Sequence, residues 1–280
     1  MVTKMNGKAA NLLGSKIVAM TLGELRDSIF SLASIQRPAY VCFATAHMLV
    51  ETTRDAKIRS AYQNASMISP DGVPVMWFVR MLGYASAECI SGPRAMSVLL
   101  HEAAERGVSV GFYGGREQTL TLVQERIALE FPTLKIAYCF SPPFRALTQD
   151  EQEQHLEEIN RSGAQLLFVG LGSPKQECWM DRFSPRLKCV CLGIGAALEF
   201  FSGEKVLPPV WIQKCGLTWF VRLCQEPRRL ARRNLYSPVF LILAFGWTFM
   251  NEARRNRWDA SLSRRLSGAT SAAQGQPLSG

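Results

Sequence analysis

The stretch Ile68-Ser69-Pro70-Asp71-Gly72-Val73-Pro74-Val75-Met76-Trp77 joins a strand-like apolar approach to an apolar, helix-like segment through a Pro-Asp-Gly turn. Proline restricts the residue before it, and glycine adopts backbone angles that other residues avoid, so this turn has a tightly specified geometry. It holds one of only six aspartates in the chain. One interpretation is a turn aspartate that bonds its own backbone. The alternative is a carboxylate placed for chemistry at the end of a central strand.

Strand-like apolar runs alternate with helix-like segments through most of the chain. We expect strands over residues 16–20, 39–44, 67–68, 108–113, 135–139, 166–169 and 189–192. We expect helices over residues 21–33, 48–65, 73–82, 94–105, 117–131 and 149–163, and one that Ser173 caps. Capping-box spacings open the first and the sixth of these helices. Near-continuous apolar strands between helices predict an α/β fold, a Rossmann-like and mostly parallel sheet that is flanked by helices.

Positive charge is concentrated in the C-terminal part of the chain. Residues 205–280 hold 12 Lys and Arg against 3 Asp and Glu, whereas residues 1–204 hold 20 of each kind. Such asymmetry indicates a polyanionic partner: nucleic acid, an anionic membrane surface or the phosphates of a substrate. We therefore expect a flexible leader (1–15), a Rossmann-like body (16–204), a basic helical appendage (205–260) and a disordered tail (261–280).

The cysteine pattern and the absence of targeting signals favour a reduced, cytosolic setting. The eight cysteines include no Cys-x-x-Cys pair and no cluster with zinc-finger spacing. No apolar run reaches the roughly 20 residues that span a bilayer. The aromatic-rich segment 234–250 lies between arginine clusters, as in helices that lie in a membrane interface. The alternative is a helix that packs on the body and leaves its charges in solvent.

Ligands of open parallel sheets collect at the carboxyl ends of the strands, where four features of this sequence fall. They are Thr45-Ala46-His47, Pro70-Asp71-Gly72, Gly114-Gly115 and the run from Gly170 to Glu177. The two glycine turns open helices, whose free N–H groups favour phosphates. Each feature also has a structural interpretation: Gln176 as a capping-box partner of Ser173, Lys175 as a solvated residue, and His47 as a core histidine.

No Asp-x-Asp pair occurs in the sequence, and neither glycine turn is a GxGxxG or P-loop motif. Sugar-nucleotide enzymes that hold a diphosphate through a metal ion usually need such a carboxylate pair. We therefore expect no metal and no cofactor, and we expect backbone amides and arginines to bind any phosphates.

Taken together, the motifs resemble the WecG/TagA/CpsF family of bacterial glycosyltransferases over roughly residues 17–235. The matching pieces are Thr45-x-His47, Pro70-Asp71-Gly72, Gly92-Pro93, Tyr113-Gly114-Gly115, the run from Val169 to Trp179 with its P-K-Q-E block, Gly193 to Phe200, Gly216-Leu217-x-Trp219-x-x-Arg222, and Glu226-Pro227-x-Arg229. The P-K-Q-E block and the G-L-x-W…E-P-x-R block are specific together, and they occur in the right order.

The resemblance implies an inverting, metal-independent transfer of a sugar from a UDP-sugar to an undecaprenyl-diphosphate-linked saccharide. By this analogy Asp71 is the general base, and Thr45 and Gln176 position the donor or the acceptor. The remaining residues carried over as substrate-binding are His47, Gly114, Gly115, Gly172, Lys175, Arg222, Arg229 and Arg232. The arginines would neutralise a diphosphate from an appendage that also brings these enzymes to the anionic inner face of the cell membrane. We expect no nucleic-acid partner, and we count a homo-oligomer among the open alternatives.

Four positions depart from the family pattern, and the first is His47, where the family often has Asn. Cys89 stands where the family often has Arg, and Arg94 and Glu199 stand where it often has Asp. The donor is therefore open among N-acetylmannosamine, its uronic acid and glucose, and we favour exopolysaccharide synthesis. The rival hypotheses are a nucleotide-binding oxidoreductase and a non-catalytic protein that binds membrane or nucleic acid.

Overall fold

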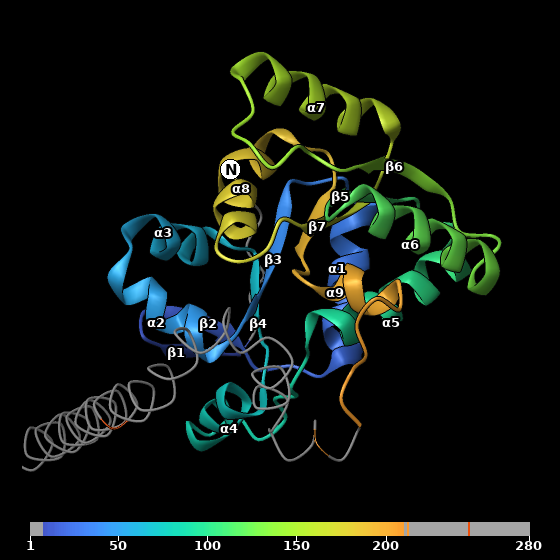
Figure 1. Cartoon of the computed structure of the whole chain (residues 1–280). Helices are drawn as coiled ribbons and strands as arrows, with labels where there is room; N and C mark the ends of the chain where they lie inside the picture. Colours follow the sequence, from blue (N-terminus) through green and yellow to red (C-terminus); the bar gives the residue numbers. More distant parts are fainter. Residues whose placement is uncertain (1–7, 210–211, 213–245, 247–280) are drawn as a thin grey trace, which may run out of the picture.

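Six parallel strands form the central sheet of the computed structural model, which describes residues 8–209, 212 and 246 (Figure 1). The strands are β3 (Ala39–Ala44), β4 (Met67–Pro70), β5 (Val110–Gly114), β6 (Ile136–Phe140), β7 (Leu166–Gly170) and β8 (Val190–Gly193). Their order is β4-β3-β8-β7-β5-β6, and all five pairings are parallel. The predicted Rossmann-like α/β fold is confirmed.

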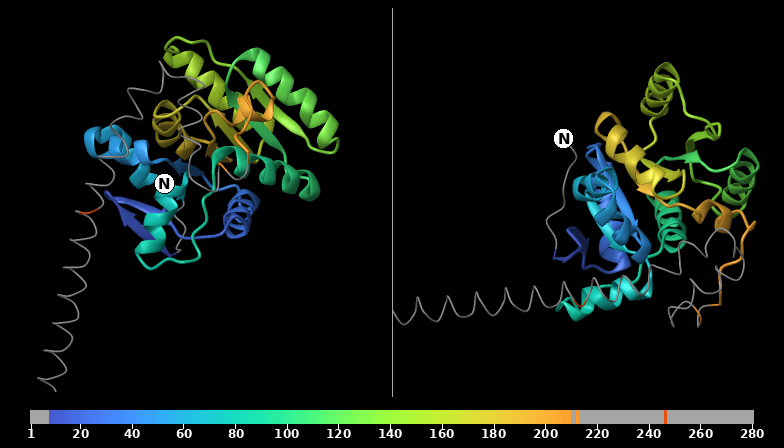
Figure 2. Two further views of the ribbon diagram at one scale, coloured as in Figure 1. Left: turned by 60° about the horizontal axis from the view of Figure 1, so that its bottom comes forward. Right: turned by 60° about the vertical axis from the view of Figure 1, so that its left-hand side comes forward.

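Helices cover both faces of this sheet, as the two further views in Figure 2 show. One face carries α1 (Leu22–Ser34), α5 (Gly92–Arg106), α6 (Glu117–Glu130) and α9 (Ala197–Phe201). The other carries α2 (Ala46–Arg54), α3 (Ala56–Asn64), α4 (Val73–Met81), α7 (Gln149–Ser162) and α8 (Lys175–Phe183), which runs into the short 3-10 helix Ser184–Arg186. Side chains of β3 alternate between the two cores: Val41 and Phe43 pack on one face, and Tyr40 and Cys42 on the other. This alternation explains why all six residues of β3 are apolar and buried.

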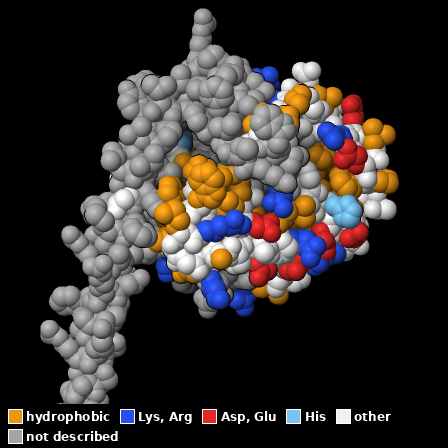
Figure 3. Space-filling view, turned by 90° about the horizontal axis from the view of Figure 1, so that it is seen from below, with side chains coloured by type: hydrophobic (Ala, Val, Ile, Leu, Met, Phe, Trp, Pro, Cys, Tyr) orange, Lys and Arg blue, Asp and Glu red, His pale blue; other side chains and the backbone are white. Residues whose placement is uncertain are grey.

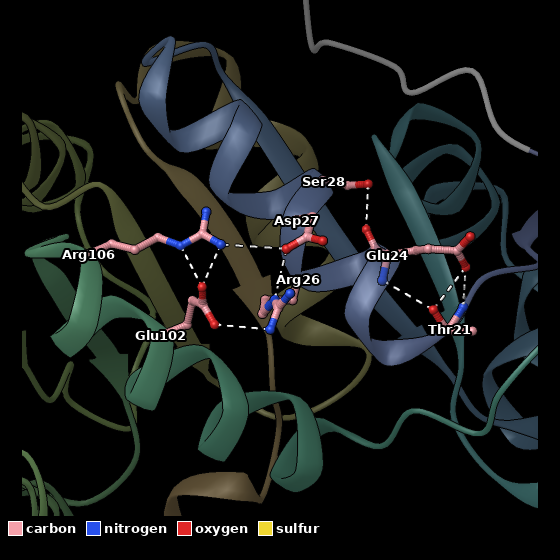
Figure 4. Close-up of polar contacts among 7 residues, drawn as sticks. All are labelled: Thr21, Glu24, Arg26, Asp27, Ser28, Glu102 and Arg106. Carbon is pink, nitrogen blue, oxygen red and sulfur yellow. Dashed lines mark hydrogen bonds and ion pairs between the residues drawn. The ribbon is translucent and has the colours of Figure 1, made fainter.

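Helix α1 begins at a capping box and joins α5 through ion pairs (Figure 4). The Thr21 hydroxyl oxygen accepts from the backbone N–H of Glu24 (3.2 Å), and the Glu24 carboxylate accepts from the backbone N–H of Thr21 (2.7 Å). Arg26 on α1 contacts Glu102 on α5 at 3.1 Å. The predicted capping box is confirmed here, and so is the second one, at Thr148 and Glu151.

The structure shortens the flexible leader expected over residues 1–15. Residues 1–7 lie outside the described part, but β1 (Ala9–Leu12) and β2 (Ser15–Val18) form an antiparallel hairpin. Ala10, Leu12 and Ile17 are buried against the α2–α4 side of the body. The apolar residues alternate over only four positions beside lysines, so the strand signal is weak. Burial on the body, which the sequence does not show, makes the hairpin favourable.

A second correction concerns the single helix expected over residues 48–65, because the structure has two helices there. Asp55 has an extended backbone (φ −118°, ψ 121°) that ends α2. Its carboxylate accepts from the N–H groups of Lys57 (2.7 Å) and Ile58 (3.4 Å) and so caps α3.

No helix within the described residues is long and apolar enough to cross a membrane. The basic appendage expected over residues 205–260 and the tail over 261–280 lie outside the described residues, apart from residues 205–209, 212 and 246.

Candidate active site

The strand ends that carry the sequence motifs lie along one edge of the sheet. Ala44 at the end of β3 pairs with Pro70 at the end of β4. Gly193 at the end of β8 pairs with Cys42 of β3 and with Val169 of β7. Because the strands are parallel and end in register, the residues that follow them meet at this carboxyl edge. The prediction that the four features share one edge is confirmed.

Thr45 and Asp71 are the first residues after a directly paired set of strand ends. The backbone N–H of Asp71 donates to the carbonyl of Ala44 at 3.0 Å, which extends the β3–β4 ladder by one bond. Thr45 is the N-cap of α2, and its hydroxyl oxygen accepts from the N–H of Met48 at 3.3 Å. The structure therefore brings together the two residues predicted to be catalytic.

The loop from Gly83 to Ser91 holds the Asp71 turn from the other side. The N–H of Gly72 donates to the thiol sulfur of Cys89 (3.3 Å), and the N–H of Ile90 donates to the carbonyl of Pro70 (2.9 Å). Gly72 has φ +105°, a conformation that L side chains rarely adopt, so a glycine is required at this turn. Both sides of the turn are thus tied to structure that is distant in sequence.

Cys89 presents a neutral thiol to this turn. Burial and then the nearby charge of Asp71 raise the pKa of Cys89 to about 11, so the thiol stays protonated at neutral pH. Arg94 donates to the carbonyl of Cys89 (3.1 Å) and contacts Glu88 at 3.4 Å. The Cys89–Gly72 contact was not predicted, because 17 residues separate the partners and no spacing signals it.

Gly114 and Gly115 lie where β5 and β7 end side by side. Gly114 pairs with Gly170, and the N–H of Gly115 donates to the carbonyl of Gly170 at 3.1 Å. Gly114 has φ +111°, and a Cβ atom there would lie 2.6 Å from the carbonyl carbon of Gly170. This glycine turn therefore allows the ends of β5 and β7 to approach each other closely. Helix α6 begins just after the turn, at the carboxyl edge of the sheet.

Gln176 links α8 to the turn after β8. Its side-chain N–H group donates to the carbonyl of Gly193 (2.8 Å), and its side-chain oxygen accepts from the N–H of Gly195 (3.0 Å). It is 2% exposed, so the amide points into the protein. Gln176 thus shapes the carboxyl edge through the Gly193–Gly195 turn, and the predicted contact with substrate stays a prediction.

Other predictions for this segment turn out differently. Ser173 does not cap α8; the helix begins at Lys175 after Pro174, without a side-chain cap. The hydroxyl of Ser173 instead donates to Glu177 at 2.7 Å. Gly172 lies in the turn before the helix, and Lys175 is exposed at its first position.

Glu177 was not among the predicted site residues, yet it is fully buried beneath this edge. Its Oε1 accepts from Ser173 and from the side-chain N–H of Gln176 (3.0 Å), and its Oε2 has no hydrogen-bond partner among the described residues. Burial raises the pKa of Glu177, and the hydrogen bonds from Ser173, from its own backbone N–H and from Gln176 oppose this effect only in part. Helical spacing could have predicted this burial, because Glu177 lies three residues before Met180 and shares the buried face of α8 with it.

The remaining predicted residues divide into one that is described and three that are not. His47 lies in the first turn of α2, half-buried, with Nδ1 3.9 Å from the Glu51 carboxylate. Arg222, Arg229 and Arg232 lie outside the described residues. Within the part of the chain that the structure describes, no group of three or more His, Cys, Asp or Glu residues could hold a metal ion.

Comparison with known proteins places this arrangement in a family. The sequence profile of the glycosyl transferase WecG/TagA/CpsF family matches residues 10–254. The N-acetylglucosaminyldiphosphoundecaprenol N-acetyl-beta-D-mannosaminyltransferase of Bacillus spizizenii is 26% identical over 204 residues, which are 72% of this chain and 77% of that protein. The enzyme of the same name from Bacillus subtilis is 28% identical over 190 residues, 68% of this chain and 72% of that protein. The chain therefore belongs to the WecG/TagA/CpsF family of glycosyl transferases.

Proposed function

We propose that this hexosyltransferase moves a sugar from a UDP-sugar to an undecaprenyl-diphosphate-linked saccharide, with inversion and without a metal ion, in the synthesis of a bacterial surface polysaccharide or exopolysaccharide. Its relatives bear the name of a transferase that acts on a lipid-linked acceptor. The observation that carries the proposal is that Asp71 and Thr45 directly follow two paired residues, Pro70 and Ala44. β3 and β4 are neighbouring parallel strands, and the hydrogen bond from the Asp71 N–H to the Ala44 carbonyl fixes the position of the Asp71 backbone beside Thr45.

In the proposed reaction Asp71 is the general base. Its carboxylate takes the proton of the acceptor hydroxyl while that oxygen attacks the anomeric carbon of the donor. The new C–O bond forms as the bond between the anomeric carbon and the UDP oxygen breaks, and UDP leaves with the electron pair. A single displacement of this kind inverts the anomeric centre. Thr45, one strand away, positions the reacting sugar.

The diphosphates of donor and acceptor need positive charge or N–H donors around them. We assign Arg222, Arg229 and Arg232 to this role on the family resemblance. Glycine turns at the carboxyl edge, at Gly114-Gly115 and at Gly172, open α6 and α8 and supply N–H groups. Lys175 and His47 are the further substrate contacts in this proposal.

The donor is of the N-acetylmannosamine or glucose type. The relatives' name supports an N-acetylmannosamine donor. Cys89 argues for a donor that differs from that of the relatives, because a neutral thiol contacts the Asp71 turn at a position where the family often has a charged arginine. We place the enzyme at the cytoplasmic face of the cell membrane, where anionic lipid attracts the basic residues beyond residue 204.

The test is transfer from a panel of labelled UDP-sugars to a lipid-diphosphate-linked acceptor, with and without EDTA. We expect one donor to react, and the rate to be unchanged by EDTA. No transfer from any donor, or an absolute requirement for metal, would falsify the proposal.

Asp71→Asn tests the base. General-base catalysis typically contributes about 10²–10⁴-fold to a rate, so turnover falls by about that factor while donor binding is kept. The matched control is Asp150→Asn, which changes an exposed aspartate at the start of α7 and leaves turnover unchanged. Near-wild-type turnover of the Asp71 variant would remove this residue as the base.

A further inference from the structure

Helix α4 is apolar on nearly every side, although only one side packs on the body. Arg80 is the only charged residue of its sequence V-P-V-M-W-F-V-R-M. Val75 and Val79 are fully buried, whereas Trp77 is 53% exposed and Met81 is 60% exposed. Trp77 and Met81 are four residues apart and therefore lie on the same face of the helix. A surface helix normally directs polar residues outward, so this outward face is expected to meet something other than water.

The exposed face of α4 lies at the same end of the protein as the candidate active site. The helix begins at Val73, two residues after Asp71, and it lies at the lower end of the molecule in Figure 1. The segment after α9, orange in the same figure, descends to this end as well, and its Val206 is 75% exposed. Figure 3 views the molecule from this end and shows hydrophobic side chains gathered beside a mixture of Lys, Arg, Asp and Glu side chains.

Other strongly exposed apolar side chains lie elsewhere. Ile35 follows α1 and Leu129 lies near the end of α6, and both of these helices lead into strands at the opposite, amino edge of the sheet. Phe144 is 92% exposed and follows β6, which is at the other end of the strand order from β4. Leu129 is 85% exposed, so it provides a matched comparison for the α4 face.

The composition of this face fits the interface of an anionic bilayer. Tryptophan is enriched at the level of the lipid headgroups, and arginine is attracted to anionic lipids. The Arg80 side chain is exposed next to Met81, and its Nε–H group donates to the carbonyl of Ala87 at 2.8 Å. The chain that continues from this end of the body adds 12 Lys and Arg against 3 Asp and Glu.

We propose that Trp77, Arg80 and Met81 form a membrane-contact surface that sets the carboxyl edge of the sheet against an anionic bilayer. The inference rests on the proposed function, in which the diphosphate of the acceptor lies at the bilayer surface. Helix α4 begins two residues after Asp71, so contact of α4 with the membrane surface would bring the proposed base close to the lipid-linked acceptor. The surface belongs to α4 of the described body, whereas the basic appendage is expected to begin at residue 205.

Binding of the full chain to vesicles tests the surface. The vesicles contain equal parts phosphatidylglycerol and phosphatidylethanolamine, or phosphatidylcholine alone, and bound protein is measured by sedimentation. We expect the double variant Trp77→Ser/Met81→Ser to raise the lipid concentration for half-maximal binding about tenfold on both kinds of vesicle. Arg80→Gln raises it about fivefold on the anionic vesicles alone. Leu129→Ser leaves both values unchanged.

Two acceptors separate this inference from the proposed function. The double variant should transfer sugar to a short-chain, water-dispersed acceptor at the wild-type rate and lose transfer to a polyprenyl acceptor embedded in vesicles. Unchanged vesicle binding by the double variant, with wild-type transfer intact, overturns the surface and leaves the function standing. Weakened vesicle binding with no transfer by the wild type to either acceptor overturns the function and leaves the membrane-contact surface standing.

Two further measurements decide between occupants of the α4 face. Light scattering would show a wild-type dimer that the double variant loses if a second copy covered the face. Thermal unfolding without lipid would show a lower melting temperature for the variant if another segment of this chain covered it. Either result overturns the assignment to a bilayer, which requires an unchanged mass and an unchanged melting temperature in the absence of lipid.

Discussion

Glu177→Gln tests whether burial raises the pKa of the carboxyl under the active-site edge. The substitution keeps the size of the side chain and the oxygen that accepts from Ser173 and Gln176. It removes only the ability to ionise. Burial raises the pKa of Glu177 in the folded protein above the value of an exposed glutamate, about 4.3.

The sign of the effect follows from proton linkage. Below the unfolded-state pKa both states of the wild type carry the proton, so the stability from the raised pKa is fully present. As the pH rises toward the folded-state pKa, the unfolded chain loses its proton first, and the free energy of unfolding falls by up to about 1.4 kcal/mol per pH unit. The Gln variant lacks this term. Its stability relative to the wild type therefore rises with pH over the same window.

The assay is urea unfolding of both proteins between pH 4 and pH 8, with the difference in unfolding free energy plotted against pH. Glu153→Gln is the matched control, because Glu153 is exposed and its hydrogen bond with Arg186 lowers its pKa. For this control the wild-type carboxylate contributes to the free energy of unfolding above its ordinary pKa, and this contribution is lost as the pH falls. The difference in unfolding free energy therefore changes with pH in the opposite direction. A Glu177 difference that stays constant across the pH range would refute the raised pKa.

Three further substitutions test local geometry. Gly114→Ala should cost about 2–4 kcal/mol in thermal unfolding, because the new Cβ meets Gly170 at 2.6 Å, whereas Gly163→Ala, with open space around it, should cost only about 1 kcal/mol. Gln176→Ala should cost about 2–4 kcal/mol and speed hydrogen exchange at the Gly195 N–H, which loses its partner; unchanged exchange would contradict the inward placement of the amide. Asp55→Ala should cost about 0.5–2 kcal/mol by removing the α3 cap, which chemical denaturation would measure; no loss would show that the cap is dispensable.

The fold could be predicted because its strands are buried on both faces. Residues 39–44 are all apolar, and the expected strand has the bounds of β3. The expected strand at 67–68 is two residues shorter than β4, because Ser69 and Pro70 do not look like strand residues. They extend the strand because Phe43 and Ala44 of β3 pair with them. Partners of this kind are set by tertiary structure, and local sequence does not record them.

The location of the candidate site could be predicted more readily than the contacts that its side chains make. The convergence of the motifs follows from parallel strands alone, so Thr45 and Asp71 were expected at one edge. The inward direction of Gln176 and the burial of Glu177 depend on how α8 packs on β8. In the sequence, the P-K-Q-E motif (residues 174–177) indicates a polar helix start that Ser173 caps. The packing instead directs two of its polar side chains into the core.

The Asp71 turn shows why such contacts matter for the proposed chemistry. A general base must lie within hydrogen-bond reach of the proton that it takes, so the backbone that carries it must be held in place. Here the N–H of Asp71 is held by β3, that of Gly72 by Cys89, and the carbonyl of Pro70 by Ile90. The three bonds come from both sides of the turn, and α4 continues from it toward the proposed membrane-contact surface. A change in the 83–91 loop can therefore alter the placement of the carboxylate without touching the substrate, and position 89, whose thiol sulfur accepts from the N–H of Gly72, is the point at which it would do so.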